Sequence, residues 1–172
     1  MLDAIFDFDN RWFLKFNQWQ RFKPLTQFFR FASRTGDGYL YALFGALALA
    51  SNDTNNLLFV KVVLLAFLFE IPSFILLKQV LKRQRPFEQI GSCFCAINPS
   101  DKFSMPSGHT AAAFIMACLI SQFYPQWTIA AYIWASIISF SRVFLGVHYP
   151  TDLAVGAVLG LFCSYISLVT LL

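Results

Sequence analysis

Charged residues are scarce in this sequence of 172 residues. They make up 13% of the chain, whereas apolar residues make up 58% and the mean hydropathy is +0.59. Soluble domains carry roughly 25% charged residues, so the composition excludes an ordinary soluble protein and indicates an integral membrane protein. The formal net charge is +4. In a membrane protein this excess suits anionic lipid head groups and phosphate substrates better than nucleic acid, for which the sequence contains no binding motif.

Cysteine and histidine are also rare, with four and two residues respectively. Cys118 and Cys163 lie in apolar runs, where cysteine packs as a small core side chain. Cys93 and Cys95 share a polar segment and are separated by one residue, so a disulfide between them would be strained. We expect free thiols there, with a disulfide within this loop as the alternative. Since the sequence has no zinc-type Cys/His set, we expect no metal and no other cofactor.

The first residues predict an amphipathic helix over 2–23. Its apolar side carries Leu2, Ile5, Phe6, Phe8, Trp12, Phe13, Phe16 and Trp19. Its polar side carries Asp3, Asp7, Asn10, Arg11, Lys15, Asn17, Gln18 and Arg21. Such a pattern is typical of a helix in the membrane interface; a helix packed on the rest of the protein is the alternative. Pro24 is expected to end this helix before a second short one over 25–34. Early aspartates replace the basic segment of a cleavable signal peptide, so none is expected.

Five apolar segments predict transmembrane helices, over residues 39–50, 57–77, 108–124, 127–145 and 151–172. The first is too short to cross a hydrocarbon core of about 30 Å alone, so it must borrow residues from the preceding helix, beyond the break at 36–38. The sequence therefore predicts a single all-α membrane domain over 1–172. Interfacial helices occupy 1–35 and a bundle of about five spans occupies 36–172. Glu70, inside the second span, is expected either to hydrogen-bond within the bundle or to take part in proton movement.

Three polar islands interrupt the apolar sequence, at residues 78–86, 106–109 and 141–152. The first ends the second span, the second begins the third span, and the third joins the fourth span to the fifth. Because consecutive spans alternate in direction, all three islands are expected at the same face of the membrane. Charge in a bilayer is costly, so charged islands of this kind indicate a functional site.

The islands carry a recognisable pattern. They contain Lys78-x6-Arg85-Pro86, then Pro106-Ser107-Gly108-His109, then Ser141-Arg142-x5-His148-x3-Asp152. This three-part pattern resembles the signature of the type 2 phosphatidic acid phosphatase family, within the superfamily of lipid phosphatases and vanadium haloperoxidases. All positions are filled in the right order, and the resemblance is to short bacterial membrane members of the family.

The residue types in the islands suit phosphate transfer. Lys78, Arg85 and Arg142 supply positive charge, and the arginine fork matches phosphate oxygens. Ser107 and Gly108 begin a helix, where backbone N–H groups favour an anion. The resemblance implies that these five residues bind the phosphate. No metal is then required, because the cations take the charge role that Mg²⁺ plays elsewhere.

Two histidines and one aspartate are expected to perform the reaction. If Asp152 lies one helical turn after His148, its carboxylate can hold one imidazole nitrogen and leave the other as a nucleophile. His109 can protonate the leaving oxygen and later activate water. The resemblance implies that His148 forms a phosphohistidine, that Asp152 orients it, and that His109 is the general acid.

Three other polar residues of the islands are left outside the predicted site. Ser141 is expected only to cap a helix or to pack. Lys82 and Arg83 lie inside the first motif but off its fixed positions. We expect these two side chains to meet lipid head groups or the outer charges of the substrate.

The expected function is that of a lipid phosphatase, a metal-independent ester or anhydride hydrolase that removes phosphate from a lipid phosphate or pyrophosphate. By resemblance, undecaprenyl pyrophosphate is the first choice of substrate, and phosphatidylglycerol phosphate, phosphatidic acid and lipid A phosphates are alternatives. Two other hypotheses compete: a lipid phosphotransferase with the same site, and a non-enzymatic binder or transporter of anionic lipid. The expected partners are membrane lipids and not nucleic acid. The sequence does not determine the oligomeric state.

Two arguments disagree about the membrane face of the site. Of thirteen Lys and Arg residues, twelve lie near the N-terminus or on the motif side, and only Lys61 lies toward the other face. The positive-inside rule then places the site in the cytoplasm. The bacterial members that the sequence resembles mostly act on the periplasmic side. Three of the charges belong to the predicted site and several more to the interfacial helix, which weakens the rule. By resemblance we therefore expect a bacterial inner-membrane protein with an extracytoplasmic active site.

Overall fold

Helices form the framework of the protein in a computed structural model that describes residues 2–51, 53–91, 93–99 and 101–172. They are α1 (Leu2–Asn17), α2 (Lys23–Thr35), α3 (Tyr39–Ala50), α4 (Thr54–Leu81), α5 (Pro86–Gln89), α6 (Gly108–Phe123), α7 (Thr128–Phe144) and α8 (Pro150–Leu171), with 3-10 turns at Gln18–Arg21 and Pro125–Trp127. No strand occurs within the described ranges. The predicted all-α class is confirmed.

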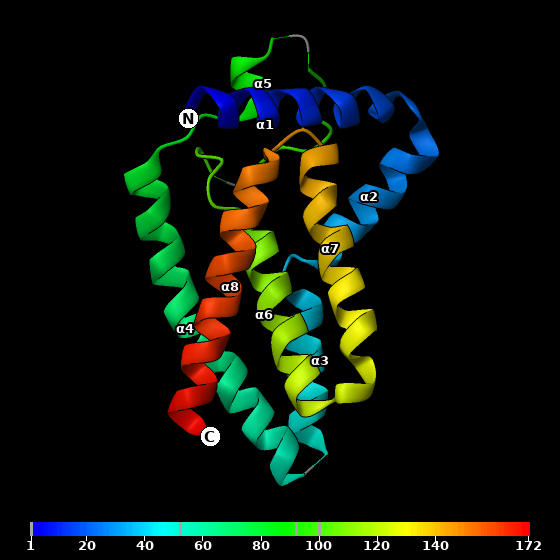
Figure 1. Cartoon of the computed structure of the whole chain (residues 1–172). Coiled ribbons are helices and arrows are strands. Elements are labelled where there is room, and N and C mark those ends of the chain that lie inside the picture. The colour runs from blue at the N-terminus through cyan, green and yellow to red at the C-terminus, as the bar shows by residue number, and fades with distance from the viewer. Residues whose placement is uncertain (1, 52, 92, 100) are drawn as a thin grey trace.

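Helix α6 lies at the centre of the bundle and packs against α4, α7 and α8 (Figure 1). Its small residues Ala111, Ala113 and Ala117 are buried. On α8, a Cβ atom added to Gly160 would lie 2.3 Å from the carbonyl oxygen of Ala111. Only glycine permits so close an approach of two backbones. Small residues on both sides therefore let α6 and α8 pack side by side, with their N-termini at the same end of the bundle.

The apolar helices account for the predicted spans. Three segments are long and apolar enough to cross a membrane: Thr54–Gln89, which contains α4 and α5, Pro125–Phe144 and Pro150–Leu171. The helices α3 and α6 are shorter and also apolar. α3 extends along only part of the bundle, and α2 leads into it obliquely from the upper end (Figure 1). This arrangement fits an apolar run that borrows length from the helix before it. The chain is an integral membrane protein.

The N-terminal region differs from the prediction in its helix boundaries. α1 ends at Asn17 and a 3-10 turn follows, so residues 2–23 do not form one helix. Pro24 lies in the first turn of α2 and helps to begin that helix; it does not end the previous one. The physical reason is that a first helical turn leaves its N–H groups without intrahelical partners, so proline, which has no N–H, fits there.

Helix α1 lies across the upper end of the bundle (Figure 1). Asp9, Phe13 and Asn17 follow one another at intervals of four residues and are buried against the protein, whereas Phe6 and Phe8 are exposed. One stripe of α1 is therefore packed on the bundle while another presents aromatic rings outward. The sequence assigned Phe13 to the membrane side and Asn17 to the polar side; both face the bundle instead.

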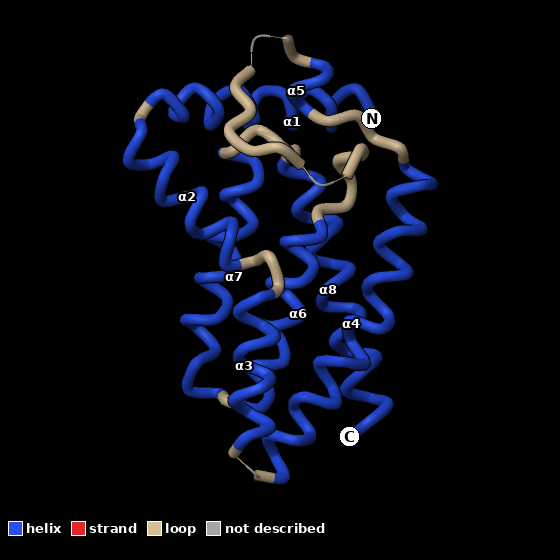
Figure 2. The backbone as a smooth tube through the Cα atoms, turned by 180° about the vertical axis from the view of Figure 1, so that it is seen from behind, coloured by secondary structure: helices blue, strands red, loops and turns tan. Residues whose placement is uncertain are grey.

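The chain between α4 and α6 covers the same end of the bundle (Figure 2). This segment lies between the predicted spans 57–77 and 108–124, and it contains the single-turn helix α5. Cys93 and Cys95 carry free thiols, as do the other two cysteines. No disulfide therefore joins Cys93 to Cys95.

Candidate active site

The three polar islands meet at the end of the bundle that α1 covers. This end holds the C-terminus of α4, the N-terminus of α6, and the connection from α7 to α8 (Figure 1). A direct backbone contact joins the second island to the third, because the N–H of Ser107 donates to the carbonyl oxygen of Asp152 at 3.1 Å. The shared face that alternating spans predicted is confirmed.

His148 and Asp152 form a buried pair where α8 begins. Nδ1 of His148 lies 3.5 Å from Oδ2 of Asp152, which is longer than an ordinary hydrogen bond. The same Oδ2 accepts a hydrogen bond from the N–H of Tyr149 at 2.7 Å. Burial lowers the pKa of His148 to about 4, although the Asp152 carboxylate acts in the opposite direction. The imidazole is therefore neutral at pH 7, the state that a nucleophile requires.

The chain has only two histidines, so the protonation of His148 is measurable directly. In a His109→Gln variant, ¹⁵N-labelled histidine reports on His148 alone. We expect the imidazole to stay neutral as the pH falls from 7 to 5, because its pKa of about 4 lies well below the ordinary value of 6.5. Nitrogen chemical shifts recorded in detergent over this range check the expectation. A titration midpoint near 6.5 would show that burial does not control this group.

Lys78 and Arg85 converge on one carboxylate. Both side chains bind Oδ1 of Asp101, Arg85 at 2.7 Å. Arg85 is buried and also donates to the carbonyl oxygen of Val147 at 2.7 Å. Burial alone would raise the pKa of Asp101, but the hydrogen bond and charge of Lys78, with Arg85 beside it, hold that pKa below its ordinary value. Asp101 is therefore an anion held between two of the predicted phosphate ligands. The sequence did not identify it, since it belongs to no spaced motif.

Arg142 and His109 lie on a polar pocket of about 420 Å³ between α2, α6 and α7. Nη1 of Arg142 donates to Oγ of Ser33 at 2.5 Å, and Nε2 of His109 lies 2.7 Å from Oδ1 of Asp37. Arg142 is buried, and its Nε has no hydrogen-bond partner among the described residues. The pocket thus offers a cation with unused hydrogen-bonding capacity beside an imidazole. The sequence noted Asp37 only as part of a helix break and did not single out Ser33.

Ser107 and Gly108, at the start of α6, have different roles. The N–H of Ser107 is already engaged by Asp152, and its hydroxyl accepts a hydrogen bond from Thr110 at 3.0 Å. The first helical bond of α6 runs from the N–H of Ala111 to the carbonyl of Ser107, so the N–H of Gly108 precedes the helical ladder. A Cβ atom on Gly108 would lie 3.0 Å from the ring of Phe74. Ser107 therefore fixes α6 to α8, whereas Gly108 brings an N–H group to the helix start.

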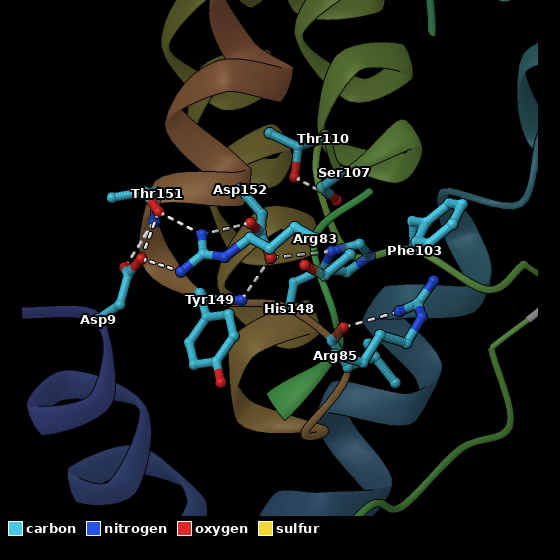
Figure 3. A network of polar contacts seen from close by, with 12 residues as sticks. Asp9, Arg83, Arg85, Phe103, Ser107, Thr110, His148, Tyr149, Thr151 and Asp152 are labelled. Carbon is cyan, nitrogen blue, oxygen red and sulfur yellow. Dashed lines mark hydrogen bonds and ion pairs between the residues drawn. The ribbon is translucent and has the colours of Figure 1, made fainter. Parts of the chain in front are cut away.

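The expectation for Arg83 was wrong. Its guanidinium does not meet lipid head groups; it lies inside the protein, with a side chain only 12% exposed. It donates to Oδ1 of Asp152 at 2.7 Å, to Thr151 at 2.7 Å and to Oδ2 of Asp9 at 2.6 Å (Figure 3). The reason is local. Lys82, the residue after the end of α4, adopts a left-handed conformation with φ of 45°, and the chain then turns back over the end of the bundle. Lys82 itself is exposed.

Metal ligands do not gather at this site. Within the part of the chain that the structure describes, there is no group of three or more His, Cys, Asp or Glu side chains placed to hold a metal ion. The site instead combines a neutral buried imidazole, a second histidine beside a pocket, and three cations. This combination suits attack on a phosphorus centre whose oxygens are bound by positive charge.

Comparison with known proteins identifies relatives over most of the chain. Residues 55–171 match the model of the PAP2 superfamily. An undecaprenyl-diphosphatase of Sulfolobus acidocaldarius is 30% identical over 141 residues, which cover 80% of this chain and 66% of that protein, just under two thirds of its length. The crystal structure of Aquifex aeolicus LpxE superposes with a TM-score of 0.81 at 29% identity, covering 92% of this chain and 93% of that one. A PAP2-type phosphatidylglycerolphosphate phosphatase of Bacillus subtilis shares the fold, with a TM-score of 0.77 at 24% identity over 97% of this chain and 86% of that one.

Proposed function

The chain belongs to the PAP2 superfamily, and we therefore propose that it hydrolyses the phosphate of a membrane lipid phosphate or pyrophosphate through a phosphohistidine on His148. The observation that carries the proposal is the meeting of His148 and Asp152 with Lys78, Arg85 and Arg142 at one end of the bundle. The charges of Arg142 and Arg85 both act on the His148 imidazole. A phosphate bound by these cations is presented to the nucleophile.

The proposed reaction has two steps. In the first, Nε2 of His148 attacks the terminal phosphorus, the bond from that phosphorus to the leaving oxygen breaks, and the leaving oxygen takes a proton from His109. The leaving oxygen is the ester oxygen of a lipid monophosphate, or the bridging oxygen of a lipid pyrophosphate, which then departs as the lipid monophosphate. In the second, a water oxygen attacks phosphorus, His109 takes the water's proton, and the phosphorus–nitrogen bond breaks to release phosphate and free His148. Asp152 stabilises the positive charge that the imidazole acquires in between.

The phosphate is bound in this proposal by Lys78, Arg85 and Arg142 together with the N-terminus of α6. Gly108 supplies an N–H at that terminus, where the helix dipole favours an anion. Ser107 contributes by tying the helix start to Asp152. Arg142 lines the polar pocket, and its buried Nε has no partner among the described residues, which supports a role for this guanidinium in binding a phosphate oxygen.

Asp101 competes with phosphate in this arrangement, because its carboxylate already binds Lys78 and Arg85. Vanadate mimics five-coordinate phosphorus and is expected to inhibit by binding at the phosphate site. We expect Asp101→Asn to remove the competing anion, so that half inhibition occurs at a vanadate concentration about tenfold lower, which corresponds to ~1.4 kcal/mol of tighter binding. Inhibition curves of purified wild type and variant check this. Lys102→Gln, which changes the charge of the neighbouring residue, is the matched control. Weaker inhibition in Asp101→Asn would instead make Asp101 a support that prearranges the two cations.

A lipid substrate fits the apolar surface beside the site. A groove of about 600 Å³ between α3, α4 and α6 is lined almost entirely by apolar side chains. It begins at Asp37, which also borders the polar pocket of His109 and Arg142, and it passes Glu70 inside the membrane-spanning part. The phosphate then lies at head-group level and the lipid chain follows the groove. We propose undecaprenyl pyrophosphate as the substrate, because the Sulfolobus relative carries that specificity in its name.

The membrane and the face of the site are also proposed. We place the protein in a bacterial inner membrane with the site on the extracytoplasmic face, as the family resemblance implies. Cys95 is exposed at the site end of the bundle, so a membrane-impermeant maleimide tests the face in intact cells. Labelling of Cys95 is expected when the other three cysteines are replaced. Labelling only after cell lysis places the site in the cytoplasm, as the Lys and Arg distribution indicates.

The proposed function is tested by phosphate release from a substrate panel. Purified protein in detergent is incubated with undecaprenyl pyrophosphate, phosphatidylglycerol phosphate, phosphatidic acid and lipid A phosphate, with His148→Ala protein prepared in parallel to measure contaminating activity. Release above that background, greatest for undecaprenyl pyrophosphate, is the expected result. Preference for another lipid corrects the substrate alone. Absence of release from every lipid contradicts the hydrolase, and transfer to an added acceptor lipid would then identify a phosphotransferase.

A further inference from the structure

Arg83 connects the catalytic aspartate to the N-terminal helix. We propose that Arg83 is a positioning residue, supported by Asp9, that holds the Asp152 carboxylate in the orientation in which it faces His148. The inference rests on the proposed function and extends it, because it makes α1 part of the support of the nucleophile. Its basis is one guanidinium bound between two fully buried carboxylates from opposite ends of the chain (Figure 3).

The two oxygens of Asp152 have separate partners. Oδ1 accepts from Nη1 of Arg83 at 2.7 Å. Oδ2 accepts from the N–H of Tyr149 at 2.7 Å and faces Nδ1 of His148 at 3.5 Å. A carboxylate held at both oxygens cannot rotate without breaking one of these bonds. Arg83 therefore fixes which oxygen faces the imidazole, and this favours the tautomer with the proton on Nδ1 and a free Nε2.

Arg83 is itself held on several sides. Its Nη2 donates to Oδ2 of Asp9 at 2.6 Å and its Nη1 donates to the Thr151 hydroxyl at 2.7 Å. The guanidinium lies 4.2 Å from the centre of the Tyr149 ring, within cation–π range. Because the planar fork spans two carboxylates, a lysine ammonium at this position cannot reproduce the geometry.

Asp9 anchors the arrangement to α1. Its carboxylate is fully buried, and it accepts hydrogen bonds from the N–H of Thr151 at 3.0 Å and from the Thr151 hydroxyl. One turn later, the buried ring of Phe13 packs on Tyr149 with centroids 5.6 Å apart. The packing of α1 across the upper end of the bundle therefore determines where Arg83 lies. If α1 moves, the support of Asp152 moves with it.

A set of variants separates positioning from lipid binding. We expect Arg83→Gln to lower kcat by about 10–100-fold, while KM changes less than threefold. This is the range measured when a group that orients a metal-binding histidine through a hydrogen bond is removed. Asp9→Asn, which keeps the shape of the side chain, is expected to lower kcat less. Combined with Arg83→Gln, it should add little, because both act through one contact. Arg83→Lys should not restore activity. The matched control is Lys82→Asn, which removes the neighbouring exposed charge.

A second measurement does not depend on turnover. The ¹⁵N shifts of His148 report its tautomer, and we expect Arg83→Gln and Asp9→Asn to change them while Lys82→Asn leaves them as in wild type. Unchanged shifts with unchanged kcat would overturn the proposal, and so would a raised KM with full kcat, which assigns Arg83 to the substrate head group. If wild type releases no phosphate, the hydrolase is wrong, and the shifts still decide whether Arg83 positions His148. If Arg83→Gln does not fold, Asp9→Asn carries the same comparison.

Discussion

Phosphate release will fall by about 10⁴-fold or more when His148 is replaced by alanine, because no covalent intermediate can form without the imidazole. His148 is 2% exposed and neutral at pH 7, so the variant removes the nucleophile without removing a buried charge. Initial rates with the preferred lipid, measured at saturating concentration, give the change in kcat.

The covalent step is open to direct test. Brief incubation of wild type with lipid carrying radiolabelled phosphate, followed by an alkaline quench, should leave label on the protein that acid then releases, as a phosphorus–nitrogen bond requires. His148→Ala should carry none. Ser141→Ala is the matched control, because this buried hydroxyl lies in the same motif and donates to the carbonyl of Ile138. It should keep both activity and label. Label that persists in His148→Ala would place the intermediate on another residue.

Replacement of His109 by glutamine is the second large effect, with an expected loss of about 10²–10⁴-fold in lipid hydrolysis, the range typical of a general acid or base. His109 lies on the polar pocket that Arg142 also lines, with Asp37 at 2.7 Å from its Nε2. Without it, the leaving oxygen departs unprotonated and water attacks without a base. Steady-state rates of wild type and variant measure the loss.

Substrates with different leaving groups separate the two roles of His109, as general acid for the leaving oxygen and as general base for water. With p-nitrophenyl phosphate, departure needs no proton, so His109→Gln should release about one nitrophenolate per active site in a fast burst and then turn over slowly. The slow phase reports the hydrolysis of phosphohistidine, which still lacks its base. Asp37→Asn should weaken the alignment of His109 and lose less activity than His109→Gln. The lipid in this comparison is a monophosphate such as phosphatidic acid, because its alkoxide needs a proton to leave, whereas a pyrophosphate releases a phosphate oxygen that needs little assistance. Equal losses for this lipid and the nitrophenyl ester, with no burst, would show that His109 does not protonate the leaving group.

Short-range relations along the chain explain why much of this candidate site was predictable. Hydropathy marked the spans, because a membrane helix must be apolar along its length. Alternation of span direction then brought Lys78, His109 and His148 to one face without any knowledge of packing. The spacing of four residues between His148 and Asp152 is a local helical relation, and the structure shows that pair at the start of α8.

Other contacts have no counterpart in a local pattern. Asp9 lies 142 residues before Thr151 and 74 before Arg83, and neither hydropathy nor helical periodicity relates residues so far apart. For this reason the sequence assigned Arg83, which lies off the fixed positions of the first motif, to lipid head groups or to the outer charges of the substrate, since a charge beside a span end ordinarily extends to the interface. Asp101 and Asp37 were missed likewise, as single acidic residues outside any spaced motif.

Sequence patterns alone predict the helical class, the membrane spans, the common face and the residues of the three islands, because each follows from the length, direction or short-range spacing of apolar segments. Packing in three dimensions, by contrast, sets which face of α1 is buried, which carboxylate lies between Lys78 and Arg85, and what holds Asp152. Those outcomes depend on how distant segments pack, where burial makes an unpaired charge too costly to leave without a partner.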